Sequence, residues 1–179
     1  MIIFRKAVAG LNETALARFT VRAQRAIGLR GEVNVLVAGN EELQALNARF
    51  RRQHRPTDVL SFPAMSGTRG LAGDLAVSSD LALLNARRMG HAAAEEMKIL
   101  VLHGLLHLAG YDHEQDQGEM ARRELRLRRR LGLPGGLIER NHPQDLSRLK
   151  TLVAKRRAVA SKLQRKTSAA ARTSKQKTR

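Results

Sequence analysis

The spacing of apolar residues predicts a few short strands in the first 80 residues. Val33, Val35 and Val37 alternate with other residues, which is the pattern of a strand with one buried face. Three further short apolar segments also favour strands; they are residues 1–8, 58–62 and 73–78. The sheet that these segments form is therefore predicted to be small.

Apolar residues at helical spacing predict helices between and after these strands. Asn12 precedes the first helix, and Asn40 and Ser79 are expected to cap the second and third. The first expected helix begins after Asn12, and the second runs from Asn40 through Phe50. The remaining three are expected over 81–89, 92–109 and 115–131. The fourth contains the apolar run 99–102, so it should be central and buried. Because helices and strands do not alternate regularly, we expect an α+β domain with a small mixed β-sheet packed with helices.

Charge divides the chain into a moderately basic domain and a strongly basic tail. The 179 residues carry a net charge of +17, and residues 150–179 hold 11 Lys or Arg and no acid. The first 149 residues therefore have a net charge of +6, with 22 basic and 16 acidic residues. We predict a domain over 1–142 and a basic C-terminal tail over 143–179, partly helical or disordered. This charge favours a polyanionic partner such as RNA.

Composition excludes several kinds of site. The chain has no cysteine, so it has no disulfide and no thiolate ligand or nucleophile, and any metal must lie on His, Asp or Glu. No apolar run approaches the roughly 18 residues that span a bilayer, and the first residues do not resemble a signal peptide. These features predict a soluble cytoplasmic protein with no membrane partner.

The segment His103-Gly-Leu-Leu-His107-Leu-Ala-Gly110-Tyr-Asp-His113 has the spacing of a metal site. Residues four apart on a helix differ by about 40° around its axis, so His103 and His107 lie on one face. A left-handed Gly110 can end the helix and return the chain so that His113 reaches the same point. Three imidazoles leave the fourth position of a tetrahedral Zn²⁺ open to water, as in catalytic sites. The spacing therefore predicts a zincin-like metal-binding helix.

This spacing also matches the metzincin protease pattern, in which a glutamate follows the first histidine. Gly104 stands at that position. The general base of peptide hydrolysis is therefore missing, while the metal geometry is kept.

Three motifs together resemble the YbeY family of bacterial metal-dependent endoribonucleases. They are HGLLHLAGYDH from His103, RPTDVLSFP from Arg55 and GDLAVS from Gly73, in the order and approximate spacing of the family. The resemblance extends from about Val33 to about Leu131. It implies that His103, His107 and His113 bind one zinc ion per chain, and that Arg51 matches the functionally important arginine of the family.

The resemblance further implies an activity, partners and a fold. The implied activity is cleavage of single-stranded RNA in the maturation of ribosomal RNA, especially at the 3′ end of the small-subunit RNA, and in ribosome quality control. The implied partners are ribosomal RNA and the ribosome or pre-ribosomal particles. The implied fold is a small sheet with helices and a central metal helix.

The residues suit such chemistry. A Zn²⁺-bound water has its pKa lowered towards about 7, and the ion polarises phosphoryl oxygens. The nucleophile that attacks the phosphodiester is therefore either the bound hydroxide or the RNA 2′-hydroxyl. Arg51 can neutralise charge on the phosphate. Three roles are open for Asp112: it orients a metal-binding histidine, it acts as an acid or base, or its carboxylate stabilises a turn. Further RNA-binding candidates are Arg49, Arg52 and Arg55. The remaining histidines, His54, His91 and His142, are expected on the surface.

Two other functions remain as alternatives. A metallopeptidase-like hydrolase would need a glutamate from elsewhere in the chain. A non-catalytic, zinc-containing ribosome-binding module would use the metal only for structure, although structural zinc normally has four protein ligands.

Overall fold

A four-stranded mixed sheet forms the centre of the fold in the computed structural model, which describes residues 1–65, 68 and 70–135. The strands lie in the order β1-β2-β4-β3. The first three are parallel to one another, and β3 runs antiparallel to β4 at one edge. The strands are β1 (Ile2–Phe4), β2 (Glu32–Ala38), β3 (Val59–Pro63) and β4 (Leu71–Ser78). The predicted α+β class with a small mixed sheet is therefore confirmed.

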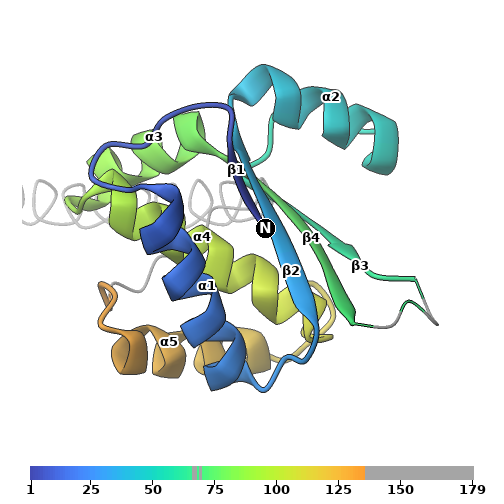
Figure 1. Cartoon of the computed structure of the whole chain (residues 1–179), viewed down its shortest axis with the longest axis vertical. Helices are drawn as coiled ribbons and strands as arrows, with labels where there is room; N and C mark the ends of the chain where they lie inside the picture. The colour runs from blue at the N-terminus through green and yellow to red at the C-terminus, as the bar shows by residue number, and fades with distance from the viewer. Residues whose placement is uncertain (66–67, 69, 136–179) are drawn as a thin grey trace, which may run out of the picture. The chain divides into compact units, whose positions relative to one another are not determined.

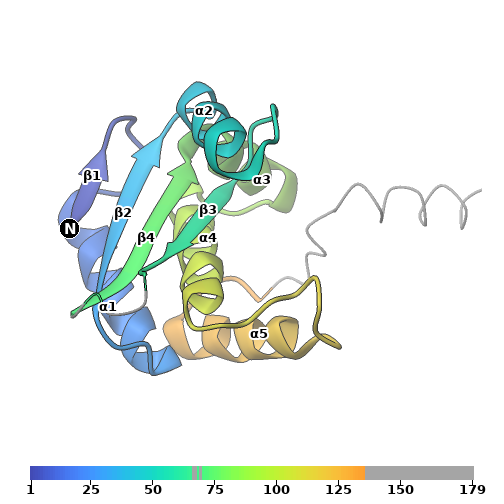
Figure 2. The ribbon, with the colours of Figure 1, turned by 90° about the vertical axis from the view of Figure 1, so that its right-hand side faces the viewer.

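Helices cover both faces of this sheet (Figures 1 and 2). The alternating valines of β2 pack with α1, α4 and α5 in the main core, and α2 covers a smaller apolar cluster on the other face. The helices are α1 (Glu13–Ile27), α2 (Asn40–Arg51), α3 (Ser79–Met89), α4 (Ala93–Leu108) and α5 (Glu119–Leu131). As predicted, α4 is central, and its residues 99–102 are buried.

Helix boundaries agree with the sequence at some ends and differ at others. Asn12 caps α1 by accepting the backbone N–H of Ala15 at 2.8 Å. The caps predicted at Asn40 and Ser79 are wrong by one residue, because Gly39 and Ser78 take those positions. The amide oxygen of Asn40 instead accepts the Ser78 hydroxyl at 2.7 Å and so joins α2 to the end of β4.

The last helix begins later than the pattern predicts. The expected start was residue 115, whereas α5 starts at Glu119. The carboxylate of Asp116 accepts the backbone N–H groups of Gly118 at 2.7 Å and Met120 at 2.6 Å, which closes the preceding turn onto the helix. The predicted boundary after residue 142 and the tail over 143–179 lie outside the described residues. None of the five described helices combines the length and the apolar composition of a membrane span.

Candidate metal centre

The three predicted histidines meet at one point. His103 and His107 come from the last two turns of α4, and His113 comes from the turn that follows. One ring nitrogen of each lies within 4.8 Å of those of the others. Gly110 has a φ of +88°, the left-handed conformation predicted for the residue that turns the chain back. The spacing argument for the site is thus confirmed in geometry.

The spacing of two of the ring nitrogens matches that of ligands on one metal ion. The Nε2 atoms of His103 and His107 are 3.2 Å apart. Two ligands on a tetrahedral Zn²⁺ with bonds of about 2.05 Å would be separated by roughly 3.3 Å. Two imidazole lone pairs at this distance repel unless a proton or a cation lies between them. The three side chains therefore fit a metal ion.

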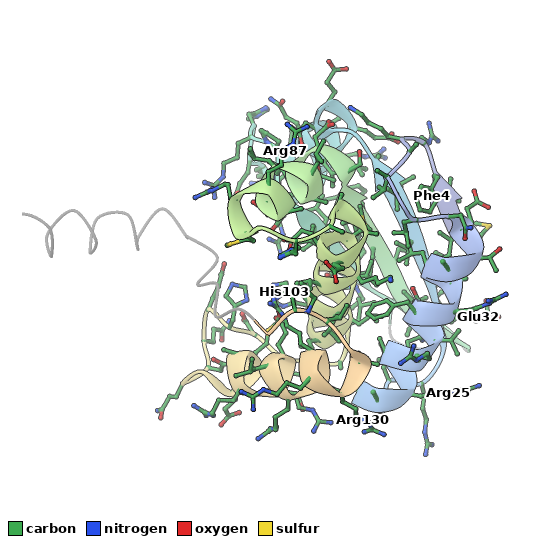
Figure 3. The ribbon with its side chains drawn as sticks, turned by 90° about the vertical axis from the view of Figure 1, so that its left-hand side faces the viewer. Phe4, Arg25, Glu32, Arg87, His103 and Arg130 are labelled. Carbon is green, nitrogen blue, oxygen red and sulfur yellow. The ribbon has the colours of Figure 1, made fainter. Side chains whose placement is uncertain are left out.

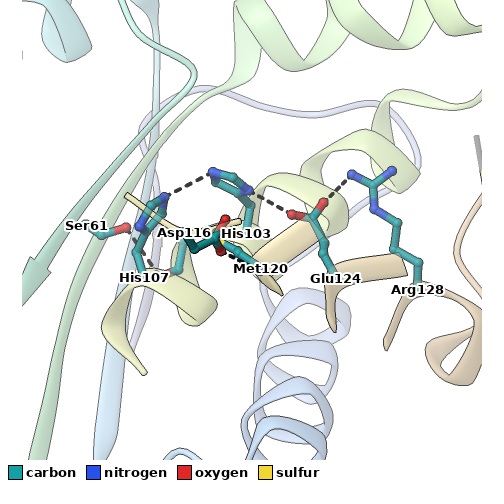
Figure 4. A network of polar contacts seen from close by, with 8 residues as sticks. Ser61, His103, His107, Asp116, Met120, Glu124 and Arg128 are labelled. Atoms are coloured by element: carbon teal, nitrogen blue, oxygen red, sulfur yellow. Dashed lines mark hydrogen bonds and ion pairs between the residues drawn. The ribbon is translucent and has the colours of Figure 1, made fainter. Parts of the chain in front are cut away.

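A buried carboxylate sets the orientation of His103 (Figure 4). The Nδ1 atom of His103 lies 2.8 Å from Oε2 of Glu124, and their side chains are 11% and 10% exposed. A carboxylate accepts, so Nδ1 carries the proton and Nε2 keeps its lone pair for a metal. The guanidinium of Arg128, one helical turn further along α5, donates to the other oxygen of Glu124. Arg128, Glu124 and His103 thus form a buried series of polar contacts that ends at the metal site.

Sequence reasoning missed both Glu124 and Arg128. Met120 and Leu127 form the buried side of α5, and Glu124 and Arg128 lie on the same side. A carboxylate followed by a guanidinium four residues later, both on the apolar side of an amphipathic helix, is a signal that could have found them, because such groups are rarely buried without partners.

Burial and neighbouring charges favour the neutral form of His107. Burial is the largest cause that lowers its pKa, and the charge of His113 lowers the pKa further. A hydrogen bond to the backbone of Tyr111 and the charge of Asp112 act in the opposite direction. Since only neutral imidazole binds a metal, a lowered pKa keeps His107 ready as a ligand near neutral pH.

Close packing against the sheet favours glycine at position 104. A Cβ atom there would lie 2.8 Å from Cδ2 of Leu75 and 3.1 Å from Cγ2 of Val59, both on the sheet. The Ser61 hydroxyl also donates to the carbonyl oxygen of Gly104 at 3.3 Å, so β3 contacts α4 closely here. The side of α4 that carries a glutamate in the metzincin pattern is therefore occupied by the sheet.

The predicted arginines occupy different surroundings at the end of α2. Arg51 is the last residue of that helix, and its charge is the smallest of the causes that shift the pKa of His107. Arg49 instead lies over the ring of Phe50, 5.3 Å from its centroid. Arg52 has a left-handed backbone at the helix end, and Nε of Arg55 donates to the side chain of Gln53 at 3.3 Å. Among the four predicted arginines, Arg51 is thus the one whose charge contributes to the lowered pKa of His107.

Asp112 takes the role of a turn carboxylate. Its Oδ1 accepts the backbone N–H of Glu114 at 3.0 Å, which was one of its predicted roles. Its charge also raises the pKa of His107.

The other histidines differ in exposure. His54 is exposed, as predicted. The surface position predicted for His91 is wrong, because its side chain is 9% exposed and its Nε2 lies 2.9 Å from the buried carboxylate of Glu96. His142 lies outside the described residues.

The fold and the site define a zincin-like α+β protein, with three histidines at the end of a central helix. Comparison with known proteins gives the family: the model of endoribonuclease YbeY matches residues 4–132, and the chain belongs to this family.

Individual proteins of this family are similar to the chain over most of their length. The chain is 54% identical to endoribonuclease YbeY of Koribacter versatilis over 140 residues, which cover 78% of this chain and 91% of that protein. It is 49% identical to that of Solibacter usitatus over 139 residues, 78% of this chain and 92% of the relative. The solution structure of TM1509 from Thermotoga maritima aligns with a TM-score of 0.50 and 30% identity, over 73% of this chain and 89% of that one. Membership of the family supports an endoribonuclease role.

Proposed function

We propose that this chain is a zinc-dependent endoribonuclease that cuts single-stranded RNA in the cytoplasm. Its substrates are precursors of ribosomal RNA, with maturation of the small-subunit 3′ end and ribosome quality control as its tasks. Its partners are ribosomal RNA and the ribosome or pre-ribosomal particles. The observation that carries the proposal is the convergence of three histidines, one of them oriented by Glu124, in a chain of the endoribonuclease YbeY family.

The residues have distinct tasks in this proposal. His103, His107 and His113 hold one Zn²⁺, which when bound activates water and polarises a phosphoryl oxygen. Glu124 keeps the Nδ1 proton of His103 in place. Arg51 offers a fork of N–H donors to two phosphate oxygens and offsets the charge that grows there during cleavage.

An exposed aromatic ring beside Arg51 supports a single-stranded substrate. Phe50 is 55% exposed and packs edge-on against Phe62, with ring centroids 5.0 Å apart. Unpaired bases stack on such rings, whereas paired bases are already stacked within a duplex. Arg49 lies over one face of this ring, so the end of α2 supplies a partly covered surface for a base together with the Arg51 cation for a phosphate.

The structure disfavours a metallopeptidase, because the sheet occupies the position of the protease glutamate next to Gly104. A structural zinc module is disfavoured because the described residues supply three ligands in one cluster rather than the four of a closed site.

Cleavage of a labelled small-subunit RNA 3′ precursor by zinc-loaded protein tests the proposal. His107→Ala removes a ligand, and His54→Ala, purified identically, is the matched control because His54 is exposed. We expect cleavage by the parent and by His54→Ala, and loss of at least a hundredfold in His107→Ala, since removal of a metal ligand removes the catalytic ion. Equal cutting by all three proteins would show that this metal centre is not the source of the RNA cleavage. If the zinc-loaded parent binds the RNA but does not cut it, the protein is a non-catalytic binding module and the endoribonuclease assignment is wrong. Hydrolysis of casein that is abolished by chelation would instead favour a peptidase.

A further inference from the structure

Two helices each present a stripe of arginines to solvent. In both stripes the residues follow the spacing i, i+4, i+7, which places three side chains within about 60° around the helix axis. All are exposed, and each stripe lies opposite the buried residues of its helix. The stripes consist of Arg18, Arg22 and Arg25 on α1, and Arg122, Arg126 and Arg129 on α5.

The two stripes lie on helices that contact each other. α1 packs against α5, and Figure 3 shows Arg25 and Arg130 projecting outward at neighbouring ends of the two helices. Arg130 is also exposed. We call the six stripe residues and Arg130 the arginine face. Because Glu124 contacts His103 from the buried side of α5, the arginine face lies on the side of that helix away from the metal centre.

The charge of the arginine face is not neutralised within the described chain. None of its seven arginines forms an ion pair with a carboxylate there. The exposed carboxylates of the two helices, Glu13 and Glu119, lie in their first turns. Arginines in a last turn also interact with the helix dipole, which accounts for Arg25, Arg129 and Arg130. It does not account for arginines further from the helix ends, such as Arg22 and Arg126. A concentration of positive charge therefore remains for an external partner.

The chemistry of the face favours phosphate. Every basic residue of α1 and α5 is arginine and none is lysine. The planar guanidinium donates through two N–H groups to two phosphate oxygens, which the lysine ammonium does not match. Neither helix exposes an aromatic ring, because Phe19 is buried and α5 has none, so unpaired bases find no surface on which to stack. The large apolar side chain that these helices expose is Val21, which is 46% exposed. One such side chain gives too little apolar area for insertion into a lipid surface.

We propose that the arginine face binds the phosphate backbone of base-paired RNA. The arginines are fixed on two packed helices, and the phosphates of a duplex form a similarly regular array, so contact requires no base sequence. This inference rests on the proposed function: the face holds the folded part of the substrate while the metal centre cuts a single-stranded segment.

Binding of a blunt RNA duplex to the full chain tests the proposal. A duplex has no single-stranded segment to be cut, so binding is measured independently of cleavage. The variant Arg22→Gln/Arg126→Gln removes one arginine from the middle of each stripe, and Gln keeps a similar helix propensity. Arg87→Gln/Arg88→Gln on α3 is the matched control, because both residues are exposed and the change in net charge is the same. Zinc content and the thermal unfolding midpoint confirm that each variant is folded.

The salt dependence identifies phosphate contacts. We expect the slope of log affinity against log salt to become shallower by about 2 in Arg22→Gln/Arg126→Gln, with a loss of about tenfold or more at 0.1 M salt. The control keeps most of the parent's affinity and slope. Equal slopes for the two variants would overturn the proposal, even where the parent cuts its precursor RNA. If the stripe variant instead loses binding only to vesicles of anionic phospholipid, the face serves a lipid surface and the RNA proposal is wrong. Failure of the parent to cut RNA, with duplex binding intact, would overturn only the proposed function.

Discussion

Replacing Glu124 by glutamine tests how strongly the buried carboxylate prepares the metal site. The substitution keeps the size of the side chain and a carbonyl oxygen that can accept from Nδ1 of His103, but it removes the negative charge. That charge acts at short range: Oε2 lies 2.8 Å from the imidazole, and the carboxylate side chain is 10% exposed. Little water is available there to screen the interaction.

The expected loss follows from this geometry. Substitution of a hydrogen-bonded partner of a metal-binding histidine typically weakens metal binding by about 10- to 100-fold. The corresponding free energy is about 1.4–2.7 kcal/mol. Arg128 also loses its anionic partner, and breaking a buried pair from one side costs about 3–5 kcal/mol of folding stability, so Glu124→Gln should also melt at a lower temperature.

Competition with a zinc chelator measures the affinity of the folded protein, at a temperature well below the melting transition. Glu119→Gln is the matched control, because it makes the same chemical change on an exposed side chain of the same helix. Nitrogen chemical shifts of His103 report its tautomer directly. If folded Glu124→Gln binds zinc as tightly as Glu119→Gln and His103 keeps its tautomer, the carboxylate does not prepare the ligand.

Two further predictions concern packing and pH. Gly104→Ala should destabilise the fold by about 1–3 kcal/mol in a denaturant titration, because its Cβ would lie 2.8 Å from Leu75; an unchanged midpoint would contradict the close contact. Because the pKa of His107 is lower in the folded than in the unfolded protein, the unfolded chain binds a proton at His107 at higher pH than the folded protein does. Metal-free protein should therefore lose stability as the pH falls below about 6.5, and the loss should stop once the pH is below the pKa of His107 in the folded protein. Thermal unfolding between pH 7.5 and 5 measures this loss, and His107→Gln should lose less; an equal loss in both proteins would exclude His107 as its source.

Local spacing was sufficient to predict that the three histidines come together. The positions of His103 and His107 depend only on helical periodicity, and that of His113 on the left-handed turn at Gly110, so neighbouring residues determine all three. The buried run in α4 was predictable for the same reason, since a helix that is apolar on all sides must lie inside the fold.

Helix starts were predicted less well, because several residues can compete for one cap. Asn40 and Ser79 are both good caps by residue type, yet each lies one position inside its helix. The Ser79 hydroxyl donates to the carbonyl oxygen of Ala38 at 3.1 Å, and Asn40 accepts from Ser78. Contacts between β2, β4 and the helices that follow them therefore decide which residue caps.

The histidine cluster, the α+β class and the family could all be predicted from the sequence, because each depends on residue types at short, regular separations. The surroundings of the three histidines could not be predicted in this way, because they depend on tertiary packing. Glu124 reaches His103 across 21 positions of the chain, and a Cβ at Gly104 would lie 2.8 Å from the Leu75 side chain of the sheet. Such contacts depend on how α4 packs against α5 and the sheet, and packing of distant segments leaves no fixed spacing in the sequence.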